Sequence, residues 1–430
     1  MPERLPLTLR TYRRLAAAAT PLAPMLLARR LKRGKEHPER LAERRGETEV
    51  ARPPGPLIWT HGASVGEMLA MIPLVERMCT RGFNVLVTSG TVTSARLAER
   101  RLPPGAIHQF VPVDAPRFIS RFLDHWQPNL ALLAESELWP NMILSSAQRA
   151  IPLILVNGRV SERSYARWRY APATIAALLE RFDLCLAQSE DDAERYTDLG
   201  APRVGMTGNL KLDVPAPPVD AQKLSAMQAA IGRRPVIAAA STHAGEEPVV
   251  VDAHRQLRKS FPGLLTIVAP RHPERGPGIV DIASVAGLPA VMRSRGHLPD
   301  RGTEIYIADT IGELGLVYRL APIVFMGGSL VRRGGQNPIE AAKLGAAIVH
   351  GPHVWNFTEI YGALDDAHGA ELIHDVHKLT VRFGAWLTDA KSRQAVSDAA
   401  LNTVELLGGA LDRTLAALEP YLMQLRLEQR

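Results

Sequence analysis

Short apolar runs alternate along this chain with longer stretches in which apolar residues recur every three to four positions. The short runs are typical of buried strands and the longer stretches of amphipathic helices. Strands are predicted at 56–60, 83–89, 106–113, 129–135, 151–157, 183–188 and 203–208, and again at 235–241, 264–270, 290–294, 304–309, 321–328 and 346–351. Helices are predicted between them, for example at 65–79, 115–125 and 138–149, and over 391–425. This alternation predicts right-handed βαβ units and mainly parallel sheets.

A proline-rich segment divides this pattern into two halves. Residues 213–222 contain Pro215, Pro217 and Pro218, a composition typical of a linker. The 430 residues suit two domains of ordinary size. We therefore predict an N-terminal segment at 1–50, a Rossmann-like domain at 51–213, a linker at 214–222, a second Rossmann-like domain at 223–405 and a C-terminal helix at 406–430.

The predicted fold class is α/β, with two Rossmann-like domains whose parallel sheets face a central cleft. Open parallel sheets bind ligands at the carboxyl ends of their strands, so the cleft is the expected site. Among glycosyltransferases this architecture is called GT-B. Epimerases and phosphorylases also use it, so the fold alone leaves the reaction open.

The N-terminal segment, residues 1–50, combines an apolar stretch with many basic residues. Residues 15–28 are mainly apolar, contain Pro21 and Pro24, and are flanked by arginines and lysines. The stretch is shorter than the ~20 residues of a membrane-spanning helix, and no convincing signal-peptide cleavage site follows it. It suits an apolar segment lying in the interface of an anionic membrane. The alternative is a helix packed on the protein with a solvated basic face.

Composition narrows the class of protein further. Hydrophobic residues make up 46% and charged residues 22%, which is typical of a soluble globular protein. Both cysteines, Cys79 and Cys185, lie in apolar surroundings, so a reducing compartment is expected. The net charge of +7 suits a phosphorylated substrate, an anionic membrane or nucleic acid. Aromatic residues are only 5% and no nucleic-acid-binding motif occurs, so we expect no nucleic-acid partner.

Two acidic motifs follow predicted strands of the first half. HGASVGE (61–67) places Glu67 in the first turn of a helix, where it could act as a general base or only cap that helix. ESELWPN (135–141) supplies Glu135 and Glu137, which share a side only if the extended geometry continues. A second carboxylate near Glu67 could raise a pKa or stabilise positive charge on a sugar. The alternative for the second motif is a polar loop with Trp139 as a core plug.

The second half carries features suited to phosphate. APRHPER (269–275) supplies Arg271 and Arg275, and arginine forms forked hydrogen bonds to phosphate. IGEL (311–314) opens a helix, and GGSLVRRGGQNPIE (327–340) ends in a helix that begins near Asn337 or Pro338. Glycine-rich backbone before a helix is suited to anions. In the second of these, Glu340 could accept ribose hydroxyls. The thirteen histidines form no HxxxH or HExxH pattern, so no metal or other cofactor is expected.

The motifs together resemble those of a known family. HGASVGE, ESELWPN, NGRVSERSY, GNLKLD, STHAGEE, APRHPER, GELGLVYRLA, FMGGSLVRRGGQNPIEAA and GPHVWNF occur here in the order found in the bacterial Kdo (3-deoxy-D-manno-octulosonic acid) transferases of lipopolysaccharide synthesis. The resemblance runs from about residue 57 to 360. It implies a metal-independent, inverting GT-B enzyme that transfers Kdo from CMP-Kdo to the lipid A precursor, lipid IVA.

The resemblance also implies roles for individual residues. Glu67 resembles the family's general base, and Glu135 and Lys211 resemble its transition-state stabilisers. The nucleotide-binding segments correspond to Pro270, Arg271, Ile311, Gly312, Glu313, Asn337, Pro338, Ile339 and Glu340. Because the acceptor is a bisphosphorylated lipid, the expected location is the cytoplasmic face of the bacterial inner membrane, with residues 1–50 contacting it. Two rivals are a nucleotide-sugar epimerase on the same frame and a basic nucleic-acid-binding protein.

Overall fold

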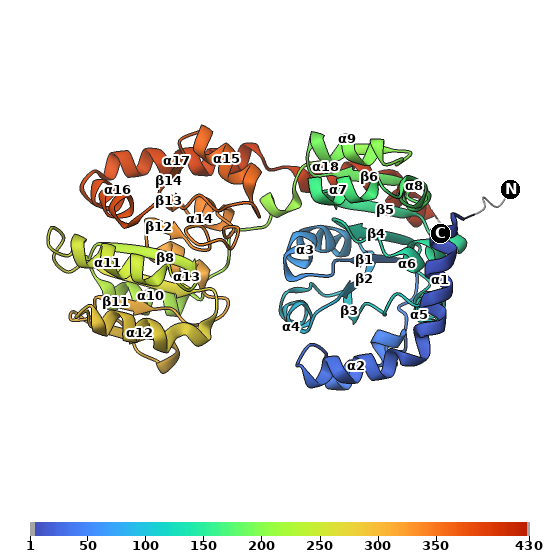
Figure 1. The fold of residues 1–430 in the computed structure, drawn as a ribbon, viewed down its shortest axis with the longest axis horizontal. Helices are drawn as coiled ribbons and strands as arrows, with labels where there is room; N and C mark the ends of the chain where they lie inside the picture. The colour runs from blue at the N-terminus through green and yellow to red at the C-terminus, as the bar shows by residue number, and fades with distance from the viewer. Residues whose placement is uncertain (1–4, 428–430) are drawn as a thin grey trace. The chain divides into compact units, whose positions relative to one another are not determined.

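The computed structural model describes residues 5–427, which form two compact units (Figure 1). Unit 1 comprises the chain up to Val214 together with the chain from Gly408 onward, and unit 2 comprises Pro215–Leu407. The C-terminal helix, α18 (Ala410–Leu427), therefore belongs to the unit in which the chain begins. The carboxylate of Asp213 fixes this return, because it accepts the backbone N–H of Gly409 at 2.7 Å and that of Leu411 at 2.5 Å.

Unit 1 contains a seven-stranded, wholly parallel sheet in the order β3-β2-β1-β4-β5-β6-β7. Its strands are β1 (Leu57–His61), β2 (Asn84–Ser89), β3 (Ala106–Phe110), β4 (Leu130–Ala134), β5 (Leu153–Gly158), β6 (Leu184–Ala187) and β7 (Val204–Met206). The strand order reverses between β1 and β4. At such a switch point the loops leave in opposite directions and open a crevice at the carboxyl edge.

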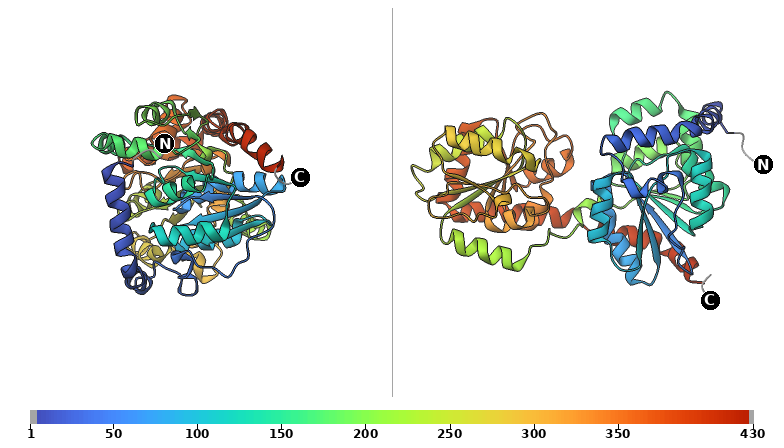
Figure 2. Two further views of the ribbon diagram at one scale, coloured as in Figure 1. Left: turned by 90° about the vertical axis from the view of Figure 1, so that its right-hand side faces the viewer. Right: turned by 90° about the horizontal axis from the view of Figure 1, so that it is seen from below.

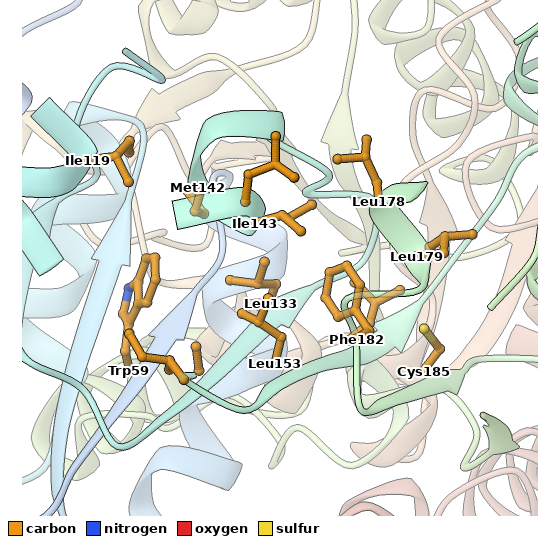
Figure 3. Close-up of a cluster of buried hydrophobic side chains, with 14 of the residues drawn as sticks. Trp59, Ile119, Leu133, Met142, Ile143, Leu153, Leu178, Leu179, Phe182 and Cys185 are labelled. Carbon is orange, nitrogen blue, oxygen red and sulfur yellow. The ribbon is translucent and has the colours of Figure 1, made fainter. Parts of the chain in front are cut away.

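Helices cover both faces of this sheet and bury it. They are α3 (Val65–Thr80), α4 (Val92–Arg101), α5 (Pro116–Trp126), α6 (Pro140–Gln148), α7 (Glu162–Trp168), α8 (Pro172–Leu179) and α9 (Glu190–Asp198), with α18. One core, part of which is shown in Figure 3, packs Trp59 and Leu133 of the sheet against Ile143, Leu178 and Phe182. A second core lies on the opposite face and includes side chains of α3 and α18. Burial on both faces explains why the strands are continuous apolar runs.

The N-terminal segment packs on unit 1 as α1 (Leu7–Ala19), a 3₁₀ turn at Thr20–Leu22 and α2 (Ala23–Lys32), with 3₁₀ turns at Pro38–Arg40 and Glu43–Arg45 (Figure 2). Leu9 and Leu27 are buried, and α1 contacts α5 and α6. Glu36 is buried in ion pairs with Arg30 and Arg44. The same segment exposes several large apolar side chains, namely Leu7, Leu15, Leu22, Met25 and Leu26.

The segment is therefore packed on the protein, as the second interpretation of its sequence expected, and it also leaves large apolar side chains open to solvent. None of the helices described between residues 5 and 427 has the length and apolar character needed to cross a bilayer.

Unit 2 contains a second seven-stranded parallel sheet, in the order β10-β11-β9-β8-β12-β13-β14. Its strands are β8 (Val236–Thr242), β9 (Leu265–Pro270), β10 (Ala290–Met292), β11 (Ile305–Ile307), β12 (Ile323–Met326), β13 (Ala347–His350) and β14 (Ala370–Leu372). Its helices are α10 (Ala221–Ile231), α11 (Glu247–Leu257), α12 (Gly276–Val285), α13 (Leu314–Leu320), α14 (Ile339–Lys343), α15 (Thr358–Asp366), α16 (Val376–Thr388) and α17 (Ala390–Leu406). Here the strand order reverses between β8 and β12.

The predicted α/β class, with two parallel sheets of the Rossmann type, is confirmed. All thirteen predicted strands are present, with ends that shift by up to three residues, and β14 is an additional strand. The stretch predicted to be helical over 391–425 consists of two helices, α17 and α18, which are separated at Gly408 and Gly409. Gly409 has φ of +79°, a conformation that glycine adopts without strain and that no α-helix contains.

Candidate active site

Glu67 lies at the switch point of unit 1, in the first turn of α3, and its carboxylate is held by its own helix end. Ser64 is the N-cap, and its hydroxyl accepts the backbone N–H of Glu67 at 3.2 Å. In return, Glu67 accepts the backbone N–H of Ala63 at 2.7 Å and the Ser64 hydroxyl at 2.7 Å. This is a capping box, which fixes the carboxylate at the carboxyl edge of β1. Glu67 does cap its helix, as the structural interpretation of its sequence expected.

The environment also makes Glu67 more basic than an ordinary glutamate. Burial raises the pKa of its carboxyl group, and the nearby charges of Glu135 and Glu137 raise it further. The hydrogen bonds from Ser64 and Ala63 oppose this rise without cancelling it. Burial and like charge both disfavour a carboxylate, so its affinity for a proton increases. A carboxylate with a raised pKa, held at a strand end, has the properties of a general base.

Glu135, directly after β4, is paired with Lys211. The Nζ atom of Lys211 lies 2.5 Å from Oε1 of Glu135, and both side chains are largely buried. Glu135 has φ of +53°, in the left-handed region that costs energy for a residue with a side chain. The hydroxyl of the buried Tyr196 donates to the backbone carbonyl of Glu135 at 3.1 Å and supports this conformation. Strained backbone conformations of this kind cluster at active sites and ligand-binding sites.

Asn157, at the end of β5, holds the loop that carries Lys211. Its side-chain oxygen accepts the backbone N–H of Leu210 at 2.9 Å, and its backbone carbonyl accepts the side-chain N–H of Gln188 at 2.9 Å. Asn157 is buried and also has a positive φ, of +54°. It was not among the predicted site residues, although it begins the NGRVSERSY string. Its buried amide fixes Lys211 against Glu135.

Glu137 has different partners from Glu135. Its carboxylate faces the buried His61, with Nε2 and Oε2 3.4 Å apart, and accepts the indole N–H of Trp139. Burial raises the pKa of Glu137, but the hydrogen bonds and charge from His61 and Trp139 lower it below the ordinary value. His61 also contacts the Thr88 hydroxyl at 2.9 Å, so it is a packed, hydrogen-bonded histidine. Trp139 is 46% exposed, so the alternative of a core plug is wrong.

In unit 2, five of the predicted nucleotide-binding residues line one small pocket. Pro270, Arg271, Ile311, Gly312 and Glu313 surround a cavity of about 100 Å³, together with Ser241, Ala308 and Thr310. Arg271 begins the loop after β9, and its backbone N–H donates to the carbonyl of Thr242 at 2.9 Å. The arginine side chain is exposed. These residues lie at the carboxyl edge of the sheet, where parallel sheets bind ligands.

Positive charge gathers beside this pocket. Burial lowers the pKa of His243, and the neighbouring His272, Arg333 and Arg271 lower it further. Glu313, by contrast, has a strongly lowered pKa, chiefly because Arg293 donates to it, with Thr310 and Lys223 as further donors. The charge of Glu313 is therefore compensated by the protein, and the exposed guanidinium of Arg271 stays available for an anion.

The remaining four predicted nucleotide-binding residues, Asn337 to Glu340, do not line this pocket. They form the start of α14, where the side-chain oxygen of Asn337 accepts the backbone N–H of Ile339 at 3.0 Å. Helix α14 contacts α13, which follows the pocket residues 311–313.

The glycine-rich loop after β12 is already occupied by a protein carboxylate. Glu246, which is fully buried, accepts the backbone N–H groups of Gly328, Ser329 and Leu330 at 2.7–3.0 Å and that of His243 at 2.9 Å. The backbone amides of residues 328–330, within the glycine-rich string 327–340, are therefore engaged by the protein itself. Burial raises the pKa of Glu246, although the four amide hydrogen bonds act against it.

Arg275 was the second arginine expected to bind phosphate, and it is engaged as well. Its guanidinium forms a two-point ion pair with the buried Glu247, at 2.9 and 3.1 Å. The two acidic residues of STHAGEE therefore have structural partners within unit 2. Glu246 holds the loop after β12, and Glu247 holds the guanidinium of Arg275. The signal in the sequence that pointed to them was a pair of adjacent glutamates a few residues after a buried strand.

The comparisons with known proteins agree with the motifs. A model of the family described as "3-Deoxy-D-manno-octulosonic-acid transferase (kdotransferase)" matches residues 39–214. The 3-deoxy-D-manno-octulosonic acid transferase of Haemophilus influenzae is 34% identical over 391 residues, which cover 89% of this chain and 92% of that protein. This chain belongs to the Kdo transferase family. It is accordingly a glycosyltransferase.

Solved structures show the same fold at low sequence identity. A glycosyltransferase from Rickettsia africae is 12% identical with a TM-score of 0.59, and the match covers 86% of this chain and 99% of that one. A putative UDP-N-acetylglucosamine 2-epimerase from Listeria monocytogenes is 15% identical with the same TM-score, covering 86% and 97%. At such identities the likeness shows the fold alone, so the epimerase rival rests on architecture, whereas the Kdo transferase family is shown by sequence.

Within residues 5–427 of this Kdo transferase family member, no three His, Cys, Asp or Glu side chains are grouped so that they could hold a metal ion. The roles assigned to Glu67, Glu135, Lys211 and the nucleotide-binding residues stay predictions. The structure brings the first three together at one sheet edge, and it brings five of the other nine together in one pocket.

We predict that Glu246→Ala destabilises unit 2 by about 3 kcal/mol or more, because it removes the acceptor of four backbone N–H groups and each unsatisfied group costs about 1–3 kcal/mol. Urea unfolding measures the change. The control is Glu274→Ala, whose side chain is 76% exposed and which should change the free energy of unfolding by less than about 0.5 kcal/mol. Equal stability of the two variants would contradict the structural role of Glu246.

Proposed function

We propose that this chain transfers Kdo from CMP-Kdo to a hydroxyl group of lipid IVA, by an inverting reaction without a metal ion, in lipopolysaccharide synthesis. The observation that carries the proposal is the arrangement at the switch point of unit 1. There a carboxylate of raised pKa, Glu67, lies beside an ion pair of Glu135 and Lys211. Membership of the Kdo transferase family supports the identity of the sugar.

The chemistry follows from these groups. Glu67 accepts the proton of the acceptor hydroxyl as the oxygen attacks the anomeric carbon of Kdo. The bond from that carbon to the phosphate oxygen breaks, and CMP leaves with the electron pair. Attack from the side opposite the leaving group in a single displacement inverts the configuration. Lys211, oriented by Glu135, supplies fixed positive charge for the anionic groups of the donor, which is where electrostatic stabilisation acts.

Unit 2 supplies the groups proposed to bind CMP. Arg271 has an exposed guanidinium for the phosphate, and a second cation, Arg333, lies close enough that both lower the pKa of His243. The pocket wall at Ile311–Glu313 and the start of α14 at Asn337–Glu340 are proposed to contact the rest of the nucleotide.

The N-terminal segment is proposed to bring the enzyme to its lipid substrate. Its exposed apolar side chains, Leu7, Leu15, Leu22, Met25 and Leu26, are accompanied by exposed basic residues including Arg10, Arg14, Arg29, Lys32 and Arg33. This combination suits an interface rich in anionic lipid. We therefore propose that the protein works at the cytoplasmic face of the inner membrane.

The direct test is to incubate the protein with freshly generated CMP-Kdo and lipid IVA, and to measure CMP release and the mass of the lipid. We expect a Kdo-bearing lipid and an equivalent amount of CMP. CMP release without a glycosylated lipid would show donor hydrolysis only. Under conditions in which a reference Kdo transferase is active, the absence of a lipid product would refute the proposed function.

We predict that Glu67→Gln lowers the single-turnover transfer rate by about 100-fold or more, because an amide cannot accept the proton. Glutamine can still take part in a capping box, so the fold and the affinity for CMP should be retained. The matched control is Glu76→Gln, an exposed position on the same helix, which should transfer at the wild-type rate. A Glu67→Gln enzyme as fast as the control would remove Glu67 from the role of base.

The pH dependence gives a second, independent prediction. The base must be ionised, so the single-turnover rate should fall as pH decreases through the pKa of Glu67, which lies above its ordinary value of 4.5. Glu137 contributes a negative charge to that rise. Glu137→Gln should therefore shift the acidic limb of the rate profile to lower pH. A limb that stays in place, or moves to higher pH, would contradict the coupling between the two carboxylates.

We predict that Arg271→Ala weakens CMP binding about 10-fold to 100-fold, because a hydrogen bond to a charged group contributes about 1.5–3 kcal/mol. Isothermal titration calorimetry with CMP measures the affinity. The control, Arg295→Ala, removes an exposed arginine that does not line the pocket and should bind CMP as the wild type does. Unchanged affinity of the Arg271 variant would refute its role.

A further inference from the structure

A second pocket of unit 1 lies beside the proposed catalytic carboxylates. It has a volume of about 350 Å³, within the range of about 300–1,000 Å³ that is typical of small-molecule sites. Its lining includes Glu137, Trp139, Arg159, Ser164, Arg167 and Trp168. The loop after β4 forms one wall and helix α7 the other, so the pocket lies at the carboxyl edge of the sheet.

Hydrogen bonds connect this pocket to the loop after β4, which carries Glu135 and Glu137. The backbone carbonyl of Arg159 accepts the Ser136 hydroxyl at 2.8 Å and the Tyr196 hydroxyl at 3.4 Å. The same Tyr196 hydroxyl contacts the carbonyl of Glu135. Glu137 belongs to the pocket lining and is close enough to Glu67 for its charge to raise the pKa of that residue. A ligand in this pocket would therefore be held at a defined position relative to Glu67.

Two indoles line the pocket without being buried. Trp139 is 46% exposed, and Trp168 is partly exposed, whereas Trp59, Trp126 and Trp386 are fully buried. An exposed tryptophan forgoes the large free-energy gain of burying its ring, which is about 150–250 Å² in area. Indole faces pack well against the C–H face of a sugar ring, since the ring is apolar on its faces and polar at its edge.

The pocket also presents positive charge. The side chains of Arg159 and Arg167 are exposed, and in the part of the chain that the structure describes neither forms an ion pair. A guanidinium binds phosphate through two parallel hydrogen bonds. Glu137, whose carboxylate is ionised at neutral pH, can accept sugar hydroxyls at the same site. Two stacking surfaces, two cations and one hydroxyl acceptor match a phosphorylated sugar.

We propose that this pocket binds a phosphorylated sugar ring of the acceptor headgroup, with Trp139 and Trp168 against the ring and Arg159 and Arg167 on the phosphate. The proposal rests on the proposed function, because it takes the acceptor to be a phosphorylated glycolipid. It assigns the acceptor to the same sheet edge that carries Glu67.

Binding can be tested without catalysis, using the full chain. Quenching of tryptophan fluorescence is titrated with the deacylated headgroup of lipid IVA, with the same headgroup after phosphatase treatment, and with inorganic phosphate. We expect saturable binding of the phosphorylated headgroup and at least 10-fold weaker binding of the other two. Equal affinity for all three, or no binding of the phosphorylated headgroup, would overturn the proposal.

Variants then locate the site. Arg167→Ala and Trp168→Phe should each raise the KM for lipid IVA several-fold, and the double change Arg159→Ala with Arg167→Ala should raise it at least 10-fold. The KM for CMP-Kdo should stay within about two-fold of the wild-type value, because these residues are none of those proposed to contact the donor, namely Lys211 in unit 1 and the CMP-binding residues in unit 2. Arg163→Ala, an exposed arginine of the same helix outside the pocket lining, is the matched control.

The two proposals fail separately. If the wild type glycosylates lipid IVA but the arginine variants keep the wild-type KM for it, the pocket assignment is wrong and the proposed function stands. If the phosphorylated headgroup binds and the variants lose this binding, but no Kdo is transferred, the pocket stands and the proposed function is wrong.

Discussion

Burial of both faces of each parallel sheet is the constraint on which the rest of the molecule depends. Strands such as Leu57–His61 and Leu130–Ala134 are fully buried, because helices cover them on each side. Polar side chains are costly there, since each would need a partner in the interior. The polar and charged side chains that can carry chemistry therefore lie at the carboxyl ends of the strands. The switch of strand order between β1 and β4 then brings two of those ends together.

At that edge of unit 1, three glutamates of the same chemical type have different environments. Glu67 is held by backbone amides and a hydroxyl and has a raised pKa, Glu135 is paired with Lys211, and Glu137 faces His61 with a lowered pKa. When neighbouring carboxylates have different environments, their pKa values differ. One site can then hold both a proton acceptor and groups whose charge stays fixed. The like charges also depend on one another, because Glu135 and Glu137 contribute to the basicity of Glu67.

In unit 2, several acidic side chains likewise accept hydrogen bonds from the backbone amides and arginines of their own unit. Glu246 occupies the amides of the glycine-rich loop, and Glu247 and Glu313 hold Arg275 and Arg293. These contacts fix the loops at the carboxyl edge and leave Arg271 exposed in a region of positive charge. Of the predicted site residues, unit 1 carries the neighbouring carboxylates Glu67 and Glu135, and unit 2 carries the exposed cation Arg271.

The sequence by itself determined where the strands lie, that the sheets are parallel and which motifs follow the strand ends, because its periodic pattern of apolar residues contains this information. That information is local, because alternating apolar runs report burial over a few residues. Which partner each charged side chain takes was decided only by the tertiary structure. Lys211 meets Glu135, and Glu246 meets Gly328, because the strand order joins segments far apart in the chain. For the same reason, the backbone amides of residues 328–330 bind a carboxylate of the protein itself, and the last helix returns to unit 1.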